Sequence, residues 1–314
     1  MDKVCSIFSQ VLKLFSRGDF EKAVRQHKAE RHARGFTSWG QFMAMLFCQL
    51  GRAHSLREIC GGLACCEGQL KHPGVPVAPK KSTLAYANEH RPWELYQTVF
   101  EQTLGKCREL VQSQGGRKKF RFRNKLLSLD GSIIDLSVSM FDWAKYKRTK
   151  GAIKLHLLLD HDGYLPSFAV VTEGKISEIK LARTLRFDPG TILAIDRGYI
   201  DYEWFRELTG QEVYFVTRMK ERAVFAVQED LEVPQNSNVV RDQIICFPRL
   251  AREGEEPVLF RRVELRDAEK DETIVFLSNL LAFGATTIAA IYKDRWQVEL
   301  FFESWTWCTP LDAM

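Results

Sequence analysis

Residues 127–136 read LSLDGSIIDL, and this stretch decides how the rest of the chain is interpreted. Its apolar residues alternate in part with small polar ones, which is typical of a β-strand that faces a core. Asp130 lies among them, where a charge is costly unless an oppositely charged group pairs with it. We therefore expect a strand beside a core whose acid needs a partner.

After this strand the chain changes from hairpin strands to alternating helices and strands. Two more strands are expected at 154–159 and 166–172, joined by a His-Asp-Gly turn. A helix at 176–186, a strand at 191–195, a helix at 202–209 and a strand at 213–217 follow. This order, in which three hairpin strands are followed by alternating helices and strands, is that of the ribonuclease H-like fold. The sequence thus predicts an α/β domain with a mixed sheet between helices, over residues 126–314.

Three other regions precede or interrupt this domain. Residues 220–280 hold short β-like runs divided by polar turns, which predict a β-rich insertion. Residues 1–110 show apolar residues at three- and four-residue spacing and predict an all-helical N-terminal domain. That domain suits DNA binding, although a plain helical bundle fits the pattern equally well. Residues 111–125 alternate basic and aromatic side chains, so this connector either contacts phosphates or is a solvated linker.

Capping residues predict where individual helices begin and end. A helix is expected at 38–50, with Thr37 or Ser38 as N-cap and Gly51 as its stop. Further short helices are expected at 55–63 and 82–102. Strong helical periodicity returns at 286–305 and predicts a final helix.

Composition excludes some classes of protein without selecting one. The chain has 314 residues, of which 45% are hydrophobic, so a sizeable core can be buried. Its formal net charge of +5 fits a polyanionic partner but does not require one. No apolar run approaches the roughly 20 residues that span a bilayer, and no signal-peptide pattern is present. We therefore expect a cytoplasmic protein without membrane contact, whose eight cysteines are mostly buried thiols.

Two aspartates are expected to meet at one edge of the sheet. Asp130 lies on the first strand and Asp196 ends the fourth, and these strands are neighbours in the ribonuclease H-like order. Adjacent carboxylates repel each other unless a cation lies between them, and two divalent cations held by carboxylates suit phosphodiester chemistry. The alternative is that one aspartate belongs to a turn and the other caps a helix.

The final helix can supply a third acid. Residues 292–303 read YKDRWQVELFFE, in which Tyr292, Arg295 and Glu299 are spaced by three and four and share one helix face. Glu299 can complete a metal site, Arg295 can hold a phosphate in a fork, and Tyr292 can donate a hydrogen bond to the DNA backbone. The alternative is an exposed charged face with an intrahelical Arg–Glu pair.

These motifs and their surroundings resemble those of IS4-family DDE transposases. The resemblance rests on the Tyr-x2-Arg-x3-Glu spacing and on a series of motifs in a fixed order: Asp130-Gly-Ser, Lys150-Gly-Ala-Ile-Lys154-Leu-His156, Asp196-Arg-Gly-Tyr199 and Phe215-Val-Thr-Arg-Met-Lys220. It implies DNA cleavage at transposon ends and strand transfer, catalysed by Asp130, Asp196 and Glu299 with Mg²⁺, for which Mn²⁺ can substitute. DNA contacts are implied for Tyr292, Arg295, Lys150, Lys154 and Arg197.

The same resemblance implies the partners. They are double-stranded DNA, as terminal inverted repeats and as target, and a second copy of the chain in a homodimer on that DNA. The protein would then work at the bacterial nucleoid. His156 follows Lys154 on the second strand and is expected to be structural rather than catalytic.

The chain departs from the family pattern at two places. Thr306 stands where the family has a lysine, and the pattern is lost after Phe302, which we interpret as a truncated or altered C-terminal part. Some relatives stack a flipped base on a tryptophan of the insertion, but none lies between Trp204 and Trp296. Residues that could replace it are Tyr214, Phe225, Phe247 and Phe260. Two alternatives stay open: a catalytically impaired form that only binds DNA, and a nuclease that cuts without joining.

Overall fold

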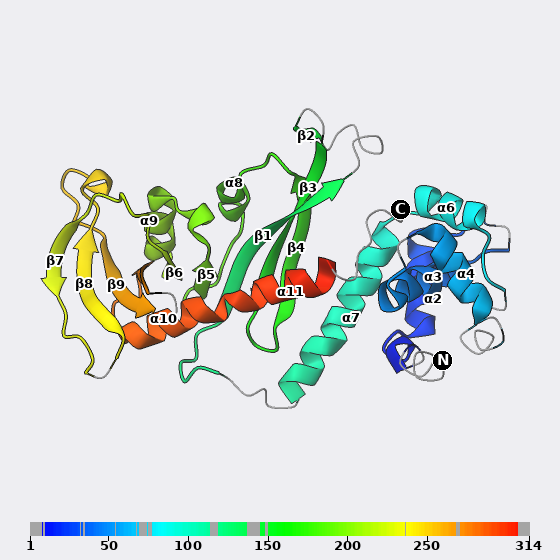
Figure 1. Cartoon of the computed structure of the whole chain (residues 1–314), viewed down its shortest axis with the longest axis horizontal. Coiled ribbons are helices and arrows are strands. Elements are labelled where there is room, and N and C mark those ends of the chain that lie inside the picture. The colour runs from blue at the N-terminus through cyan, green and yellow to red at the C-terminus, as the bar shows by residue number, and fades with distance from the viewer. Residues whose placement is uncertain are drawn as a thin grey trace. The chain divides into compact units, whose positions relative to one another are not determined.

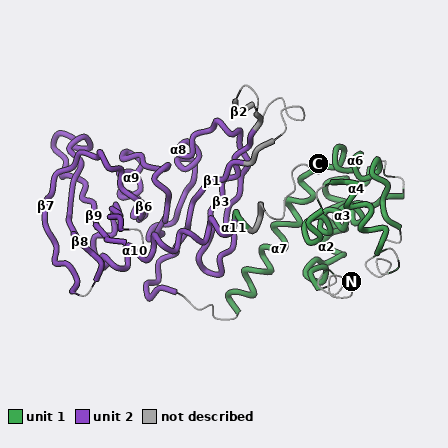
Figure 2. Tube along the Cα trace, viewed as in Figure 1, with its two compact units in different colours: residues 1–114, 302–314 green, residues 115–301 purple. Residues whose placement is uncertain are grey.

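A computed structural model describes residues 8, 10–31, 33, 35–53, 55–66, 68, 74, 77–113, 119–136, 145–147, 150–235, 237–267 and 271–306. The chain divides into two compact units, residues 1–114 with 302–314 and residues 115–301 (Figure 2). Each unit has a hydrophobic core of its own.

The first unit is helical. Its described helices are α2 (Arg17–Gln26), α3 (Ser38–Gly51), α4 (Leu56–Cys65), α6 (Lys81–His90) and α7 (Glu94–Ser113). Thr37 caps α3 as expected, because its hydroxyl accepts the Gly40 N–H at 3.1 Å. Helix α3 ends at Gly51, one residue beyond the expected span, and Arg52 instead of the glycine takes the left-handed conformation (φ 51°) that follows the last turn.

The second unit is built on a ten-stranded mixed sheet (Figure 1). Strand β1 (Leu126–Leu136) pairs antiparallel with β3 (Lys150–Asp160), which pairs antiparallel with β4 (Leu165–Glu173). On its other side β1 runs parallel to β5 (Ile192–Ile195), and β5 runs parallel to β6 (Tyr214–Arg218). A short strand, β2 (Lys145–Lys147), pairs with the start of β3. The order β4-β3-β1-β5-β6 is the one expected from the sequence, so the ribonuclease H-like fold is confirmed.

The β-rich region continues this sheet instead of forming a separate layer. Strand β10 (Glu272–Ser278) pairs antiparallel with β6, and β9 (Leu259–Asp267), β8 (Val239–Cys246) and β7 (Ala226–Asp230) follow outward in that order. The ten strands therefore share one continuous ladder of backbone hydrogen bonds.

Helices cover both faces of the sheet. Leu193 and Ile195 of β5 belong to the core that includes α9 (Tyr202–Gly210) and, at its margin, α8 (Glu178–Ala182). The alternate residues Ile192 and Ala194 belong to the core that includes α10 (Ala285–Asp294). Strand β5 is therefore buried on both faces, which explains its uninterrupted apolar sequence.

The predicted final helix is divided in two. Helix α10 is followed by α11 (Trp296–Thr306), and Arg295 lies between them. The Arg295 N–H bonds to the Tyr292 carbonyl, and the Val298 N–H bonds to the Arg295 carbonyl. Both bonds span three residues instead of four, so the helix is locally tightened at this junction. Among the described residues, no helix is both long enough and apolar enough to cross a membrane.

Candidate active site on β1, β5 and the α10–α11 junction

Asp130 is a largely buried acid on β1, with a side chain 18% exposed. Its Oδ1 accepts the Gly131 N–H at 2.8 Å, and its Oδ2 accepts a bond from Arg295 Nη1 at 2.9 Å. The pKa of Asp130 is raised to about 6, chiefly by burial and also by the negative charges of Asp196 and Glu299, against the opposing effects of Arg295 and the Gly131 N–H. This carboxylate therefore needs a cation beside it.

Asp196 reaches the same region through the pairing of two parallel strands. Leu129 of β1 lies opposite Ile195 of β5, so Asp130 and Asp196 each follow one member of a register pair. Asp196 also caps the 3₁₀ turn η2 (Arg197–Tyr199), because its Oδ2 accepts the Gly198 N–H at 3.2 Å. The backbone thereby holds one oxygen of this acid while the sheet sets its position.

Arg295 joins the third acid to the first. Its Nη2 donates to Glu299 Oε1 at 2.5 Å, while Nη1 donates to Asp130. The Arg295 side chain is only 9% exposed, and its guanidinium carbon lies 5.3 Å from the centre of the Tyr292 ring. The alternative of an exposed charged face is therefore wrong for Arg295. The Arg–Glu pair exists, but it is enclosed and linked to β1.

Tyr292 completes this group. Its ring packs on Phe276, with 5.2 Å between the ring centres, and burial raises the pKa of its phenol against the effect of Arg295. Ion pairs join Asp130, Arg295 and Glu299, and Tyr292 lies beside the Arg295 guanidinium. Asp196 follows the register partner of Leu129 on the neighbouring strand.

The remaining candidate DNA contacts lie in different settings. Lys154 is only 9% exposed, because its Nζ pairs with Glu178 Oε1 at 3.1 Å, so its charge is used inside the unit. Arg197 is exposed and lines a pocket of about 350 Å³ with Arg218 and Lys220. The side chain of Lys150 lies outside the described residues.

Two groups of the site were not identified from the sequence. A Cβ at Gly198 would lie 2.5 Å from Glu178 Oε2, so this carboxylate leaves no room for a side chain there, while Asp196 Oδ2 at 3.7 Å would be in ordinary contact. The Tyr199 hydroxyl is fully buried and has no hydrogen-bond partner among the described residues. Burial raises the pKa of Tyr199, and so do the charges of Asp130, Glu178 and Asp196. The sequence signal for this contact was Gly198 of the Asp-Arg-Gly-Tyr motif, because a side chain at that position would collide with Glu178.

The donor set suits a hard divalent cation in its chemistry. Carboxylate oxygens are the ligands that Mg²⁺ and Mn²⁺ take. Within the described part of the chain, however, no three acidic, histidine or cysteine side chains are close enough to enclose a metal. Arg295 supplies the positive charge between Asp130 and Glu299.

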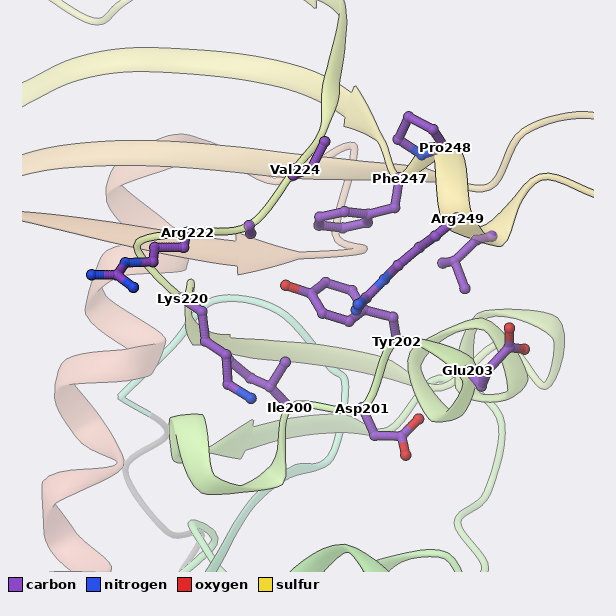
Figure 3. Close-up of a pocket in the computed structure, with 12 residues that line it drawn as sticks. Ile200, Asp201, Tyr202, Glu203, Lys220, Arg222, Val224, Phe247, Pro248 and Arg249 are labelled. Carbon is purple, nitrogen blue, oxygen red and sulfur yellow. The ribbon is translucent and has the colours of Figure 1, made fainter.

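A larger pocket, of about 830 Å³, lies where α9 begins (Figure 3). The Arg249 guanidinium stacks on the Tyr202 ring at 3.6 Å from its centre, and Phe247 forms part of the wall. Of the four aromatic residues considered in place of a tryptophan, Phe247 lines this pocket and Phe225 lines the smaller one. Phe260 is fully buried in the core.

Two family models match this chain. The transposase DDE domain matches residues 121–308, which include Asp130, Asp196 and Glu299, and a domain of unknown function, DUF4372, matches residues 4–76. A Sinorhizobium fredii protein, y4zB, named as a candidate transposase, is 29% identical over 252 residues, which are 78% of this chain and 67% of that protein.

A Geobacillus stearothermophilus protein, named as the candidate transposase of insertion sequence element IS5377, is 25% identical over 222 residues, which are 70% of this chain and 57% of that protein. The chain therefore spans about two thirds of the first relative and less than two thirds of the second. Among solved structures, piggyBac transposase in a synaptic complex with hairpin DNA aligns with 96% of this chain and 68% of its own, at TM-score 0.47 and 10% identity. That likeness is too distant to carry an assignment.

Proposed function

The chain belongs to the transposase DDE domain family, and from this premise we propose that it cuts DNA at the ends of a transposable element and joins them to a target. The observation that carries the proposal is the chain of ion pairs from Asp130 through Arg295 to Glu299, which joins residues far apart in sequence around one buried acid. Asp196 on the neighbouring strand supplies the third carboxylate.

Each residue of the site has a proposed task. Asp130, Asp196 and Glu299 would hold a divalent cation, Mg²⁺ or Mn²⁺, which would supply an activated nucleophile and stabilise charge on the leaving oxygen. Arg295 keeps two of these acids together through the two ends of its guanidinium fork. Tyr292 stays protonated, because burial raises the pKa of its phenol, and donates to the DNA backbone.

We place the DNA backbone along the basic pocket beside the site. Arg197 directly follows Asp196 in the chain, and it shares the pocket with Arg218 and Lys220. Cations in this position neutralise phosphates, so affinity should fall steeply as salt rises. Lys154 acts differently, since its pairing with Glu178 orders the acidic side of the site instead of contacting DNA.

The helical unit is proposed to bind DNA as well. The support is a pocket of about 620 Å³ lined by Lys28, Arg31 and Arg91. At this pocket the exposed Tyr86 ring stacks on His90 with 3.8 Å between the ring centres, which is a flat surface of the kind that nucleic acids contact.

The finer assignments are proposals on the same basis. The spacing of Tyr292, Arg295 and Glu299 supports the IS4 family, and the substrates would be the terminal inverted repeats and a target duplex. We propose a homodimer on this DNA, at the bacterial nucleoid in the cytoplasm, because DNA is the partner. Light scattering of the protein–DNA complex would test the dimer: a complex with a single chain would contradict it.

The experiment that tests the function uses labelled DNA carrying both flanks of the gene, purified protein, and Mg²⁺ or Mn²⁺. We expect site-specific nicking at the ends by the wild-type protein and none by Asp196→Ala. Binding without nicking by the wild type would favour the alternative of a form that only binds DNA. Nicking without joining to a target duplex would favour the nuclease.

A further inference from the structure

We infer, on the premise of the proposed transposase function, that Ser128, His161 and Asp294 form a buried hydrogen-bonded chain that positions Arg295 and Glu299 against Asp130. None of the three contacts the acids of the site directly in the described structure, so they are positioning residues and not catalytic ones.

The chain of bonds links the two halves of the site. Asp294 is the last residue of α10 and is 1% exposed, and its Oδ2 accepts a bond from His161 Nδ1 at 2.6 Å. On the other side of the ring, His161 Nε2 lies 2.7 Å from the Ser128 hydroxyl. Ser128 precedes Asp130 by two residues on β1, and Asp294 directly precedes Arg295. One end of the hydrogen-bonded chain therefore lies next to Asp130 on β1, and the other end lies next to Arg295.

The ring is oriented by its two partners. An ionised carboxylate can only accept, so Nδ1 carries a proton and donates it to Asp294, while Nε2 shares a hydrogen bond with the Ser128 hydroxyl. The backbone N–H of His161 also donates to the Leu126 carbonyl at 3.0 Å, which fixes the turn that carries His161 to the start of β1. Asp294 has two more donors, Lys119 Nζ at 2.5 Å and the Tyr164 hydroxyl at 3.2 Å.

Serine, histidine and aspartate in this order also form the triad of many hydrolases. Ser128 does not fit that role, because its side chain is fully buried. It lies inside the sheet, with Leu159 of β3 on one side and Ala194 of β5 on the other. A substrate carbonyl has no path to the hydroxyl, so the arrangement holds elements together.

The hydrogen-bonded chain fixes the junction of α10 and α11, where a small displacement would move Arg295 away from its two acids. Helices α10 and α11 meet at Arg295, whose backbone bonds span three residues, and Asp294 fixes the last residue before this junction. Beyond it, Arg295 must reach Asp130 and Glu299 at 2.9 and 2.5 Å at the same time. Because misplacement by about 1 Å can cost a reaction about 100-fold, a junction without its anchor would lose rate before it lost fold.

The test compares variants that lack individual hydrogen bonds of this network with a control variant that lacks a similar hydrogen bond elsewhere in the sheet. Ser128→Ala removes the hydroxyl, His161→Leu removes both ring bonds, and His161→Asn keeps a donor for Asp294. Ser167→Ala is the matched control, since it deletes a hydroxyl of the same sheet that donates to the Leu158 carbonyl at 3.0 Å and lies outside the site. Single-turnover nicking, DNA affinity and hydrogen exchange of residues 285–299 are measured for each.

We expect His161→Leu to lower the nicking rate by about 10- to 100-fold, the range found for groups that orient metal ligands, with DNA affinity within about 2-fold of wild type. Ser128→Ala should lower the rate less, His161→Asn should recover most of it, and Ser167→Ala should leave it unchanged. Faster exchange at residues 285–299, with unchanged exchange in β5 and α9, should accompany the loss.

A wild-type rate in His161→Leu would overturn the inference, and so would an equal loss in His161→Asn and His161→Leu. If the wild-type protein does not nick DNA at all, the proposed function fails, and hydrogen exchange alone decides the inference. Faster exchange of residues 285–299 in Ser128→Ala than in Ser167→Ala would then support it. Equal exchange in these two variants would overturn it.

Discussion

His156 should make the protein sensitive to acid, because its ring is buried without a charge. The side chain is fully buried on β3, Nε2 lies 2.9 Å from the Thr172 hydroxyl, and Nδ1 has no partner among the described residues. Burial, together with the positive charge of Lys154, lowers the pKa of His156 from 6.5 to about 4. At about 1.4 kcal/mol per pH unit, charging this ring costs the folded protein about 3 kcal/mol.

The sign of the effect follows from where the proton binds more tightly. Below pH 6.5 the unfolded chain takes up the proton, while the folded protein does so only near pH 4. The contribution of His156 to the free energy of unfolding is therefore complete above pH 6.5 and falls by about 3 kcal/mol as the pH drops to 4. His156→Gln keeps a polar atom for Thr172 and does not titrate.

Urea unfolding between pH 7.5 and 4 checks this. The free energy of unfolding of His156→Gln minus that of the wild type should rise by about 3 kcal/mol over this range, because the two proteins share every other titrating group. Thr172→Val is the control: it removes the hydrogen bond but leaves the ring, so it should be less stable and just as sensitive to acid. A difference between His156→Gln and wild type that stays constant with pH would refute the reasoning.

Three further predictions concern the site and the sheet. Asp130→Asn should abolish nicking yet raise the urea midpoint at pH 8, because burial raises the pKa of Asp130 to about 6 and the amide avoids a buried charge; persistent nicking would remove Asp130 from the site. Arg295→Lys should lower single-turnover nicking at least about 10-fold, since an ammonium cannot bridge Asp130 and Glu299 as the guanidinium fork does; a wild-type rate would contradict this. Asp242→Ala should lower the free energy of unfolding by about 3–5 kcal/mol in urea titration, because it leaves the buried Arg261 without its carboxylate; a loss below about 1 kcal/mol would show that the pair contributes little.

The sequence predicts best what depends on strand order. The alternation around Asp130 and the apolar run before Asp196 specify two strands, and the order of hairpin strands, helices and strands along the chain specifies a ribonuclease H-like sheet. In that sheet the two strands are neighbours, so the fold order, and not the local pattern, predicts that Asp130 and Asp196 lie at adjacent positions. The helical character of the first unit follows equally well from residue spacing and from the Thr37 cap.

The sequence does not predict contacts that depend on how elements meet. The division of the final helix at Arg295 comes from a change in backbone hydrogen bonding, and the periodicity of the residues does not record it. The approach of Glu178 to Gly198 joins a five-residue helix to a turn, and no spacing rule connects them. For the same reason strand alternation in the β-rich region could not show that β10 pairs with β6, because the pattern identifies a strand but not its neighbour.

The pairing of β10 with β6 has a mechanical consequence. An insertion joined to the rest of the sheet only by loops could rotate as a separate body. Here β10 is paired with β6, from Phe276 opposite Arg218 to Ser278 opposite Val216. Ser278 and Asn279 add side-chain bonds to the backbone of β6 at Phe215. The β-rich region is therefore a continuous extension of the sheet that carries Asp130 and Asp196, so its outer strands can change their distance from these acids only if the whole sheet bends.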